Sequence, residues 1–307
     1  MGLKFIRVSK RFGDRWALRD VDLEVFDGEK LGVLGETGSG KSTLLSIAAG
    51  DDKPSMGEIS ANPSIKTRRY DAQHEGSKGL FGLRPGKPTK KRSIGEVISV
   101  SSGEVLLIDN AFCSLDEFEK KEAVDAIRGA SGRTIMLAGS NFRDLADACD
   151  RIAVLVRGEL AQIGTPEEVY RTPASSLAAF ATGEINRFDA RRLSSTNAEQ
   201  PEFFTIEGEH RIFARPTERS GLGPINQTIN LAIRPEHISI STGASFPEDN
   251  LLRAIVRDIR FLGPSTRVSL DANGLKLDAS VPRVVGLEIG EECMIALPPH
   301  RVHIFRS

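Results

Sequence analysis

A glycine-rich segment early in the chain has the residue types and the spacing that bind phosphate. Residues 35–43, GETGSGKST, fit the pattern G-x-x-x-x-G-K-[ST], after an apolar run typical of a strand and before a helical pattern. Glycines let successive backbone N–H groups turn toward phosphate oxygens, and a helix N-terminus adds a positive dipole. We predict that Lys41 reaches the β- and γ-phosphates and that Ser42 offers its hydroxyl to Mg²⁺. The expected phosphate-binding residues are Gly35, Gly38, Ser39, Gly40, Lys41, Ser42 and Thr43.

A second segment, VLLIDN at residues 105–110, raises a chemical question. Its four apolar residues and terminal acid predict a buried parallel strand that places Asp109 as the Mg²⁺-holding carboxylate. The next residue is Asn110, where a carboxylate would serve as a general base. An amide orients a water molecule but does not take its proton at pH 7.

The composition limits the class of protein. A length of 307 residues predicts two domains, each able to bury a core. Lys and Arg number 41 against 42 Asp and Glu, so we expect no nucleic-acid partner. Three widely spaced cysteines argue against a disulfide framework or zinc cluster and fit a reducing cytosol. With no secretory signal and no run near ~18 apolar residues, any membrane span is expected from a partner chain.

The elements that must position these residues change in type along the chain. Residues 3–29 alternate like antiparallel strands. Residues 51–92 are poor in apolar periodicity, and the Gly-, Pro- and Lys-rich stretch at 76–92 is expected to be an irregular loop, with its basic cluster at 87–92 interpreted as a solvated linker. Between residues 105 and 156, strands alternate with helices, which predicts a parallel sheet. Thr165 and Pro166 are typical of a helix start. Beyond residue 185, short strands separated by turn residues indicate a β-sandwich or small barrel.

Taken together, these segments resemble the ATP-binding subunits of ABC transporters, and most closely those of carbohydrate (maltose-type) importers. Residues 8–45 are similar to the whole N-terminal portion of that family, with Phe12 where the family stacks an aromatic ring on adenine. Residues 151–173 resemble the end of the nucleotide-binding domain. LAIRPEHI at 231–238 and LPPHRVHIF at 297–305 are similar to the regulatory β-domain of the sugar importers.

The resemblance implies an α/β fold with three parts. Residues 1–185 are expected to form a P-loop nucleotide-binding domain with an antiparallel β subdomain and a reduced helical subdomain at about 70–95. Residues 186–201 are a polar linker, and residues 202–307 form an all-β, OB-like regulatory domain. The implied cofactors are ATP and Mg²⁺. The implied partners are a second ATP-binding subunit, in a homo- or heterodimer, and membrane permease subunits on the inner face of the cell membrane.

Several catalytic positions depart from the family pattern. Asn110 stands at the catalytic Glu position and Ser140 at the switch His position. Lys41 and Asp109 are only 68 positions apart, where the family needs several dozen more, and the LSGGQ signature falls on PGKPT at residues 85–89. Gln73 is a candidate Q-loop remnant or an ordinary polar residue. The Ser-Leu-Asp of the D-loop survives at residues 114–116, which indicates a retained dimer surface.

Three hypotheses follow from this mixture. The first is a degenerate ATP-binding subunit of a solute importer, which binds Mg-ATP with impaired or absent hydrolysis. The second is a nucleotide-gated regulatory protein that no longer docks on a permease, and the third is an inert remnant. Whether the chain is an ATPase at all stays open at this point, since the catalytic Glu, the switch His and the signature are missing.

Overall fold

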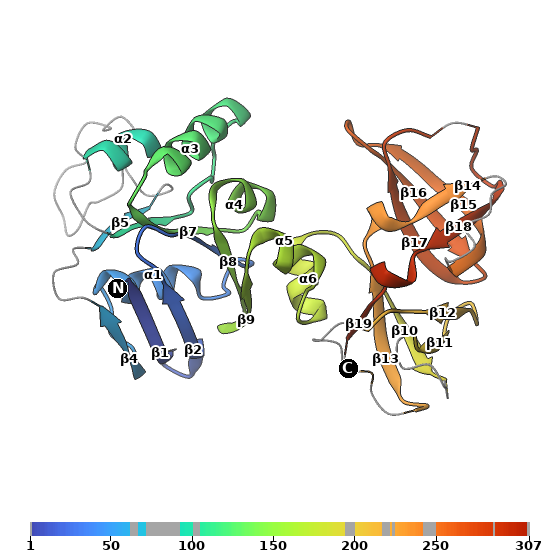
Figure 1. Cartoon of the computed structure of the whole chain (residues 1–307), viewed down its shortest axis with the longest axis horizontal. Coiled ribbons are helices and arrows are strands. Elements are labelled where there is room, and N and C mark those ends of the chain that lie inside the picture. Colours follow the sequence, from blue (N-terminus) through green and yellow to red (C-terminus); the bar gives the residue numbers. More distant parts are fainter. Residues whose placement is uncertain are drawn as a thin grey trace. The chain divides into compact units, whose positions relative to one another are not determined.

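The computed structural model describes residues 2–61, 67–71, 93–100, 105–193, 200–216, 222, 225–241, 250–284 and 286–305. The chain divides into two compact units, Met1–Pro173 and Ala174–Ser307. Figure 1 shows helices and two sheets in the first unit, and mostly strands in the second. We expected the first domain to end at residue 185; the division falls 12 residues earlier, and residues 174–185 group with the second unit.

The first unit contains a three-stranded antiparallel sheet, β2-β1-β4, and a six-stranded sheet, β5-β6-β7-β3-β8-β9. Its strands are β1 (Leu3–Phe12), β2 (Arg15–Val25), β3 (Lys30–Leu34), β4 (Met56–Ala61), β5 (Thr67–Asp71), β6 (Val105–Asp109), β7 (Thr134–Gly139), β8 (Arg151–Val156) and β9 (Glu159–Gly164). In the larger sheet only β9 runs antiparallel to its neighbour. Parallel strands are covered on both faces, which explains the nearly continuous apolar runs of β3, β6, β7 and β8.

Helices cover both faces of the six-stranded sheet. On one face, Leu44 and Leu45 of α1 (Lys41–Ala49) join a buried core with β1, β2 and the sheet. On the other face, Leu145 of α4 (Phe142–Ala148) approaches Gly32 of β3. α3 (Glu117–Gly129) packs against both α4 and α2 (Ile94–Val100). The predicted start of α5 (Pro166–Arg171) is confirmed, because Thr165 and Glu168 form a capping box around Pro166.

Two strands of the first unit lie where the sequence shows little apolar periodicity. Residues 56–61 form β4 and residues 67–71 form β5, whereas the expected irregular loop at 76–92 lies outside the described residues. β5 has the sequence TRRYD, which carries little apolar signal because the strand lies at the edge of its sheet. Its conformation is set by parallel pairing with β6, from Thr67 opposite Val105 to Asp71 opposite Asp109. The rest of 51–92 lies largely outside the described residues.

The second unit has two five-stranded sheets that share one hydrophobic core. The first has the order β12 (Arg211–Phe213), β11 (Glu202–Thr205), β10 (Asn186–Arg192), β13 (Thr228–Ile233) and β19 (His303–Phe305). The second has the order β14 (Ser239–Ser241), β18 (Glu292–Leu297), β15 (Asn250–Phe261), β16 (Thr266–Ala272) and β17 (Leu275–Val281). The unit also contains α6 (Ser176–Thr182) and the short 3₁₀ turns η1 (Pro235–His237) and η2 (Pro299–Arg301).

The predicted linker at 186–201 is also partly wrong, because residues 186–192 form β10. This strand pairs with β13 over its length and with β11 at its end. Its sequence, NRFDARR, is mostly polar, yet Phe188 and Ala190 alternate with exposed neighbours and enter the core. Two apolar residues at a spacing of two are enough to bury one face of a strand.

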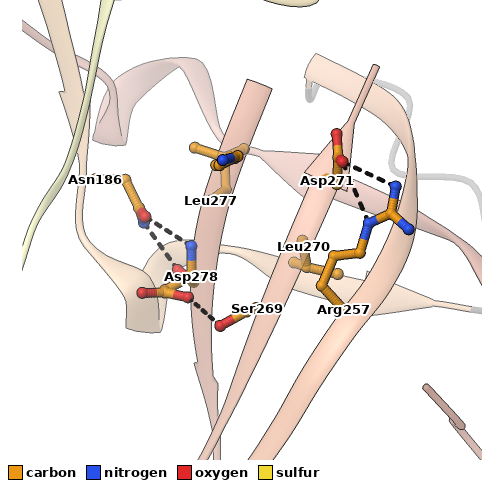
Figure 2. A pocket seen from close by; sticks show the side chains of 8 residues that line it. Asn186, Arg257, Ser269, Leu270, Asp271, Leu277 and Asp278 are labelled. Carbon is orange, nitrogen blue, oxygen red and sulfur yellow. Dashed lines mark hydrogen bonds and ion pairs between the residues drawn. The ribbon is translucent and has the colours of Figure 1, made fainter. Parts of the chain in front are cut away.

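Asn186 joins the two sheets of the second unit where β10 meets β17. Figure 2 shows its side chain against Asp278, where the amide donates to the backbone carbonyl at 2.8 Å and accepts from the backbone N–H at 2.7 Å. A pocket of about 600 Å³ opens beside this contact. The two carboxylates that line this pocket accept hydrogen bonds from within the unit. Asp278 accepts from the Ser269 hydroxyl, and Asp271 accepts from the Arg257 guanidinium. Asn186 therefore satisfies two backbone groups of Asp278 at the outer edge of β17.

Candidate phosphate-binding site

The loop between β3 and α1 has the backbone geometry that a phosphate cradle needs. Gly38 (φ 82°) and Gly40 (φ 105°) both lie in the left-handed region that glycine adopts without strain. A Cβ on Gly40 would stand 2.4 Å from the carbonyl oxygen of Ala17 in β2. A Cβ on Gly35 would meet the carbonyl oxygen of Leu155 and the Ser39 hydroxyl at the same distance. The predicted glycines are therefore required by conformation or by close packing.

Contacts with neighbouring strands hold this loop in place. The backbone N–H of Gly35 donates to the carbonyl of Gly139 at 3.3 Å, which ties the loop to the end of β7. The carbonyl of Ser39 accepts from the N–H of Gly158, in the turn between β8 and β9, at 3.0 Å. That N–H···O contact joins residues 119 positions apart, so no local pattern in the sequence indicates it.

Lys41 is folded back across the loop that precedes it. Its Nζ donates to the carbonyl oxygens of Gly35 at 2.6 Å and Glu36 at 2.7 Å, and lies 3.4 Å from the Ser39 hydroxyl oxygen. Burial lowers the pKa of Lys41 from its usual value, while the negative charges of Asp109 and Glu36 oppose that shift. The ammonium thus lies in a desolvated position where an anionic ligand would be strongly favoured.

The parallel sheet brings the candidate residues to one edge. β3, β6 and β7 run in the same direction, with β7 between the other two. Their carboxyl ends therefore carry, side by side, the phosphate loop, Asp109 and Ser140. Ligands of open α/β sheets bind at this edge. Asp109 is almost fully buried, whereas Ser42 and Ser140 are exposed.

Asn110 begins a tight turn directly after β6. Its backbone N–H donates to the Oδ1 atom of Asp109 at 3.1 Å, and its φ is 53°, in the left-handed region. Asn tolerates this region better than other non-glycine residues. The turn continues with Ser114, also at positive φ, and reaches Asp116, which caps α3 together with Glu119. The two ends of the D-loop segment at 114–116 are thus fixed by local backbone geometry.

Phe12 lies at the end of β1, beside the glycine turn that leads into β2. Its ring is 53% exposed and the Nζ atom of Lys10 lies 4.9 Å from its centroid. The same hairpin reaches the phosphate loop through Ala17, which packs against Gly40. Sequence reasoning identified Phe12 but missed Lys10, although a spacing of two on a strand places both on one face.

Two predicted features of the site lie outside the described residues. One is Gln73, the candidate Q-loop residue; the strand that precedes it, β5, ends at Asp71 on the same edge of the sheet. The other is the 85–89 segment at the signature position. Within the described ranges, no group of three or more His, Cys, Asp or Glu side chains is arranged to hold a metal ion. Ser42 and Asp109 supply a hydroxyl and one carboxylate, which fits an ion that takes its other ligands from phosphate and water.

Comparison with known proteins assigns both units. Residues 18–118 match the family model described as ABC transporter, and residues 231–305 match the one described as TOBE domain. These two matches make the chain similar to ATP-binding subunits of ABC transporters. Its first unit has the P-loop fold of ABC ATPases, and its second unit is an OB-like, all-β TOBE domain. The predicted fold class is thereby confirmed.

Three relatives show how far the similarity extends along the chain. The spermidine/putrescine import ATP-binding protein of Protochlamydia amoebophila is 27% identical, over 91% of this chain and 88% of its own. The maltose/maltodextrin import ATP-binding protein of Photorhabdus laumondii is 26% identical, over 98% and 94%. The sulfate/thiosulfate import ATP-binding protein of Synechocystis is 28% identical, over 75% and 82%. In the described parts of this chain, no helix is long and apolar enough to cross a membrane.

Proposed function

We propose that this protein is the ATP-binding subunit of an ABC-type solute importer that binds Mg-ATP and hydrolyses it poorly or not at all. One contrast supports the proposal. The phosphate loop has its glycines in the required conformation and Lys41 in a buried position, whereas the residue after Asp109 is an amide held at φ 53°. Binding and hydrolysis therefore depend on two different sets of residues at one sheet edge.

Binding uses the backbone of the loop and one cation. The N–H groups that follow Gly38 and Gly40 would donate to phosphate oxygens at the N-terminus of α1. Lys41 would exchange its contacts with the carbonyls of Gly35 and Glu36 for contacts with phosphate. Ser42, exposed in the first turn of α1, and Asp109 would hold Mg²⁺, which neutralises phosphate charge when bound. Phe12 would stack against the adenine.

Hydrolysis needs a proton acceptor, and neither Asn110 nor Ser140 supplies one. Asn110 would orient a water molecule through its amide but would not take its proton. Ser140, exposed after β7, offers a hydroxyl where the family pattern has an imidazole. We expect turnover to fall by ~10²–10⁴-fold through Asn110 alone. The effects of Asn110 and Ser140 are not additive, because residues that act on one water molecule act as a unit.

We propose that the protein works as a homo- or heterodimer of ATP-binding subunits, attached to permease subunits at the inner face of the cell membrane. The support within this chain is the retained Ser-Leu-Asp of the D-loop at 114–116. The named cargoes of the relatives include a polyamine, maltodextrin and sulfate. Carbohydrate is therefore one of several candidate cargoes.

A second function is favoured by the shortened first unit. The alignment with the Photorhabdus protein covers 355 positions and this chain has 307 residues, so at least 48 of those positions hold no residue of this chain. Together with the 68-position spacing from Lys41 to Asp109, this supports loss of most of the helical subdomain that docks on permeases in the family. The chain would then be a nucleotide-gated regulatory protein without a permease.

Two measurements test these alternatives. Titration with Mg-ATP should give saturable binding that is lost in Lys41→Ala and kept in Lys4→Ala, which alters an exposed lysine on β1. Absence of saturable binding by the native protein would leave the inert remnant as the correct description.

Purification from native membranes should recover permease subunits, identified by their sequences, if the importer role is right. Recovery of the protein in the soluble fraction alone, with ATP binding intact, would favour the regulatory role.

A further inference from the structure

Lys10 links the exposed ring of Phe12 to the far end of the phosphate-loop helix. Its Nζ donates to the Oδ1 atom of Asp52 at 2.5 Å and to the carbonyl oxygen of Lys53 at 2.8 Å. It also lies 4.9 Å from the centroid of the Phe12 ring. An ammonium has three donors, and two of them are directed to oxygen atoms. The Lys10 side chain is only 13% exposed, so the contact with the ring is made in a partly desolvated position.

Asp52 is itself held by α1, the helix that begins at Lys41. Its backbone N–H donates to the carbonyl of Ser46 at 3.3 Å, just after Gly50 ends the helix in a left-handed conformation. Its carboxylate accepts from the N–H of Lys53 and from Lys10, and these hydrogen bonds lower the pKa of Asp52. The position of the Lys10 ammonium is therefore fixed relative to α1.

We propose that Lys10 is a positioning residue for the nucleotide base: its ammonium occupies one face of Phe12 and leaves the other face for adenine. A cation within about 6 Å of a ring centroid is attracted by the ring quadrupole, which restrains the ring. Because Lys10 also contacts Asp52, the restrained ring is linked to α1, the helix that follows the phosphate loop. The inference rests on the proposed function, since it assumes that Phe12 stacks against the base.

The test is a double-mutant cycle on Mg-ATP affinity, with Lys10→Met, Phe12→Ala and the double variant. Trp16, the only tryptophan of the chain, lies on β2 of the same hairpin, opposite Arg11, and provides a fluorescence signal. Lys10→Met should weaken Mg-ATP binding roughly three- to thirtyfold, the range that a cation–ring contact supplies. In the Phe12→Ala background the same change should have no effect, because Lys10 acts through the ring. Lys10→Arg should restore affinity, and Lys4→Met, at the other end of β1, should leave it unchanged.

A ligand without a base separates positioning from general damage to the fold. Affinity for Mg-tripolyphosphate should be the same in native protein and Lys10→Met. Equal losses for both ligands, or an undiminished loss in the Phe12→Ala background, would overturn the inference while leaving ATP binding intact. If the native protein binds neither ligand, the proposed function fails and the inference fails with it.

Discussion

The loop after β3 and the turn after β6 end at the same edge of one sheet, but they differ in what their residues can do. The loop keeps each element that phosphate binding needs: left-handed glycines, a helix N-terminus and a buried lysine. The turn holds Asp109 and Asn110 in a fixed backbone geometry, and the proposed function places Asn110 where a proton acceptor would be needed. Binding depends on backbone shape and on one cation, whereas bond cleavage depends on the chemical type of one or two side chains.

The largest expected effect comes from restoring side chains on the hydrolysis side. Asn110→Glu combined with Ser140→His should raise phosphate release by ~10²-fold or more over the native protein, because a carboxylate can accept the proton of water. Glu at φ 53° should cost about 1 kcal/mol of folding stability, as left-handed backbone disfavours it. Phosphate release and urea unfolding measure the two effects. Unchanged release in the double variant would show that elements outside this edge limit turnover.

On the binding side, two glycine substitutions with different surroundings sharpen the comparison. Gly40→Ala should destabilise the first unit by about 3 kcal/mol and abolish Mg-ATP binding, since its Cβ would stand 2.4 Å from a backbone oxygen at a strained φ. Gly38→Ala meets open space and should cost only about 1 kcal/mol, the strain of its left-handed φ. Urea unfolding and Mg-ATP titration should rank the pair in this order. Equal effects would mean that the loop does not have this packing.

A smaller effect is expected from pH. Phosphate binding needs protonated Lys41, and burial lowers the pKa of that lysine. Mg-ATP affinity should therefore be constant from neutral pH up to the lowered pKa of Lys41. It should fall as the pH rises through that pKa, at a lower pH than for an ordinary lysine. Lys41→Arg, which stays charged, provides the control. A flat profile for the native protein up to the ordinary lysine pKa would contradict a desolvated ammonium.

The parts of this fold that the sequence predicted are those with a strong local signal. The phosphate loop, the apolar strand ending in Asp109 and the capping box at Thr165 each combine a residue pattern with the element it favours. β5 and β10 were missed, because an edge strand such as TRRYD carries little apolar signal and β10 buries only Phe188 and Ala190 among polar residues. Such strands are fixed by pairing with partners distant in sequence.

The same limit applies to the candidate site. Phe12, Lys41, Asp109 and Asn110 follow from motif positions, but the Lys10–Asp52 contact joins residues 42 positions apart. Likewise, the hydrogen bond from the Gly158 N–H to the Ser39 carbonyl in the phosphate loop depends on the order of strands in the sheet. Non-local contacts of this kind require the tertiary fold, because no periodicity or spacing encodes them.

The most direct test of the central claim is to measure Mg-ATP binding and phosphate release on one preparation of the native protein. Binding should saturate, and release at saturating Mg-ATP should fall at least ~10²-fold below the 1–10³ s⁻¹ typical of enzymes. Asn110→Glu should raise release while leaving the binding curve nearly unchanged. Ordinary turnover by the native protein, with release lost in Lys41→Ala, would contradict the account, because Asn110 would then not limit hydrolysis.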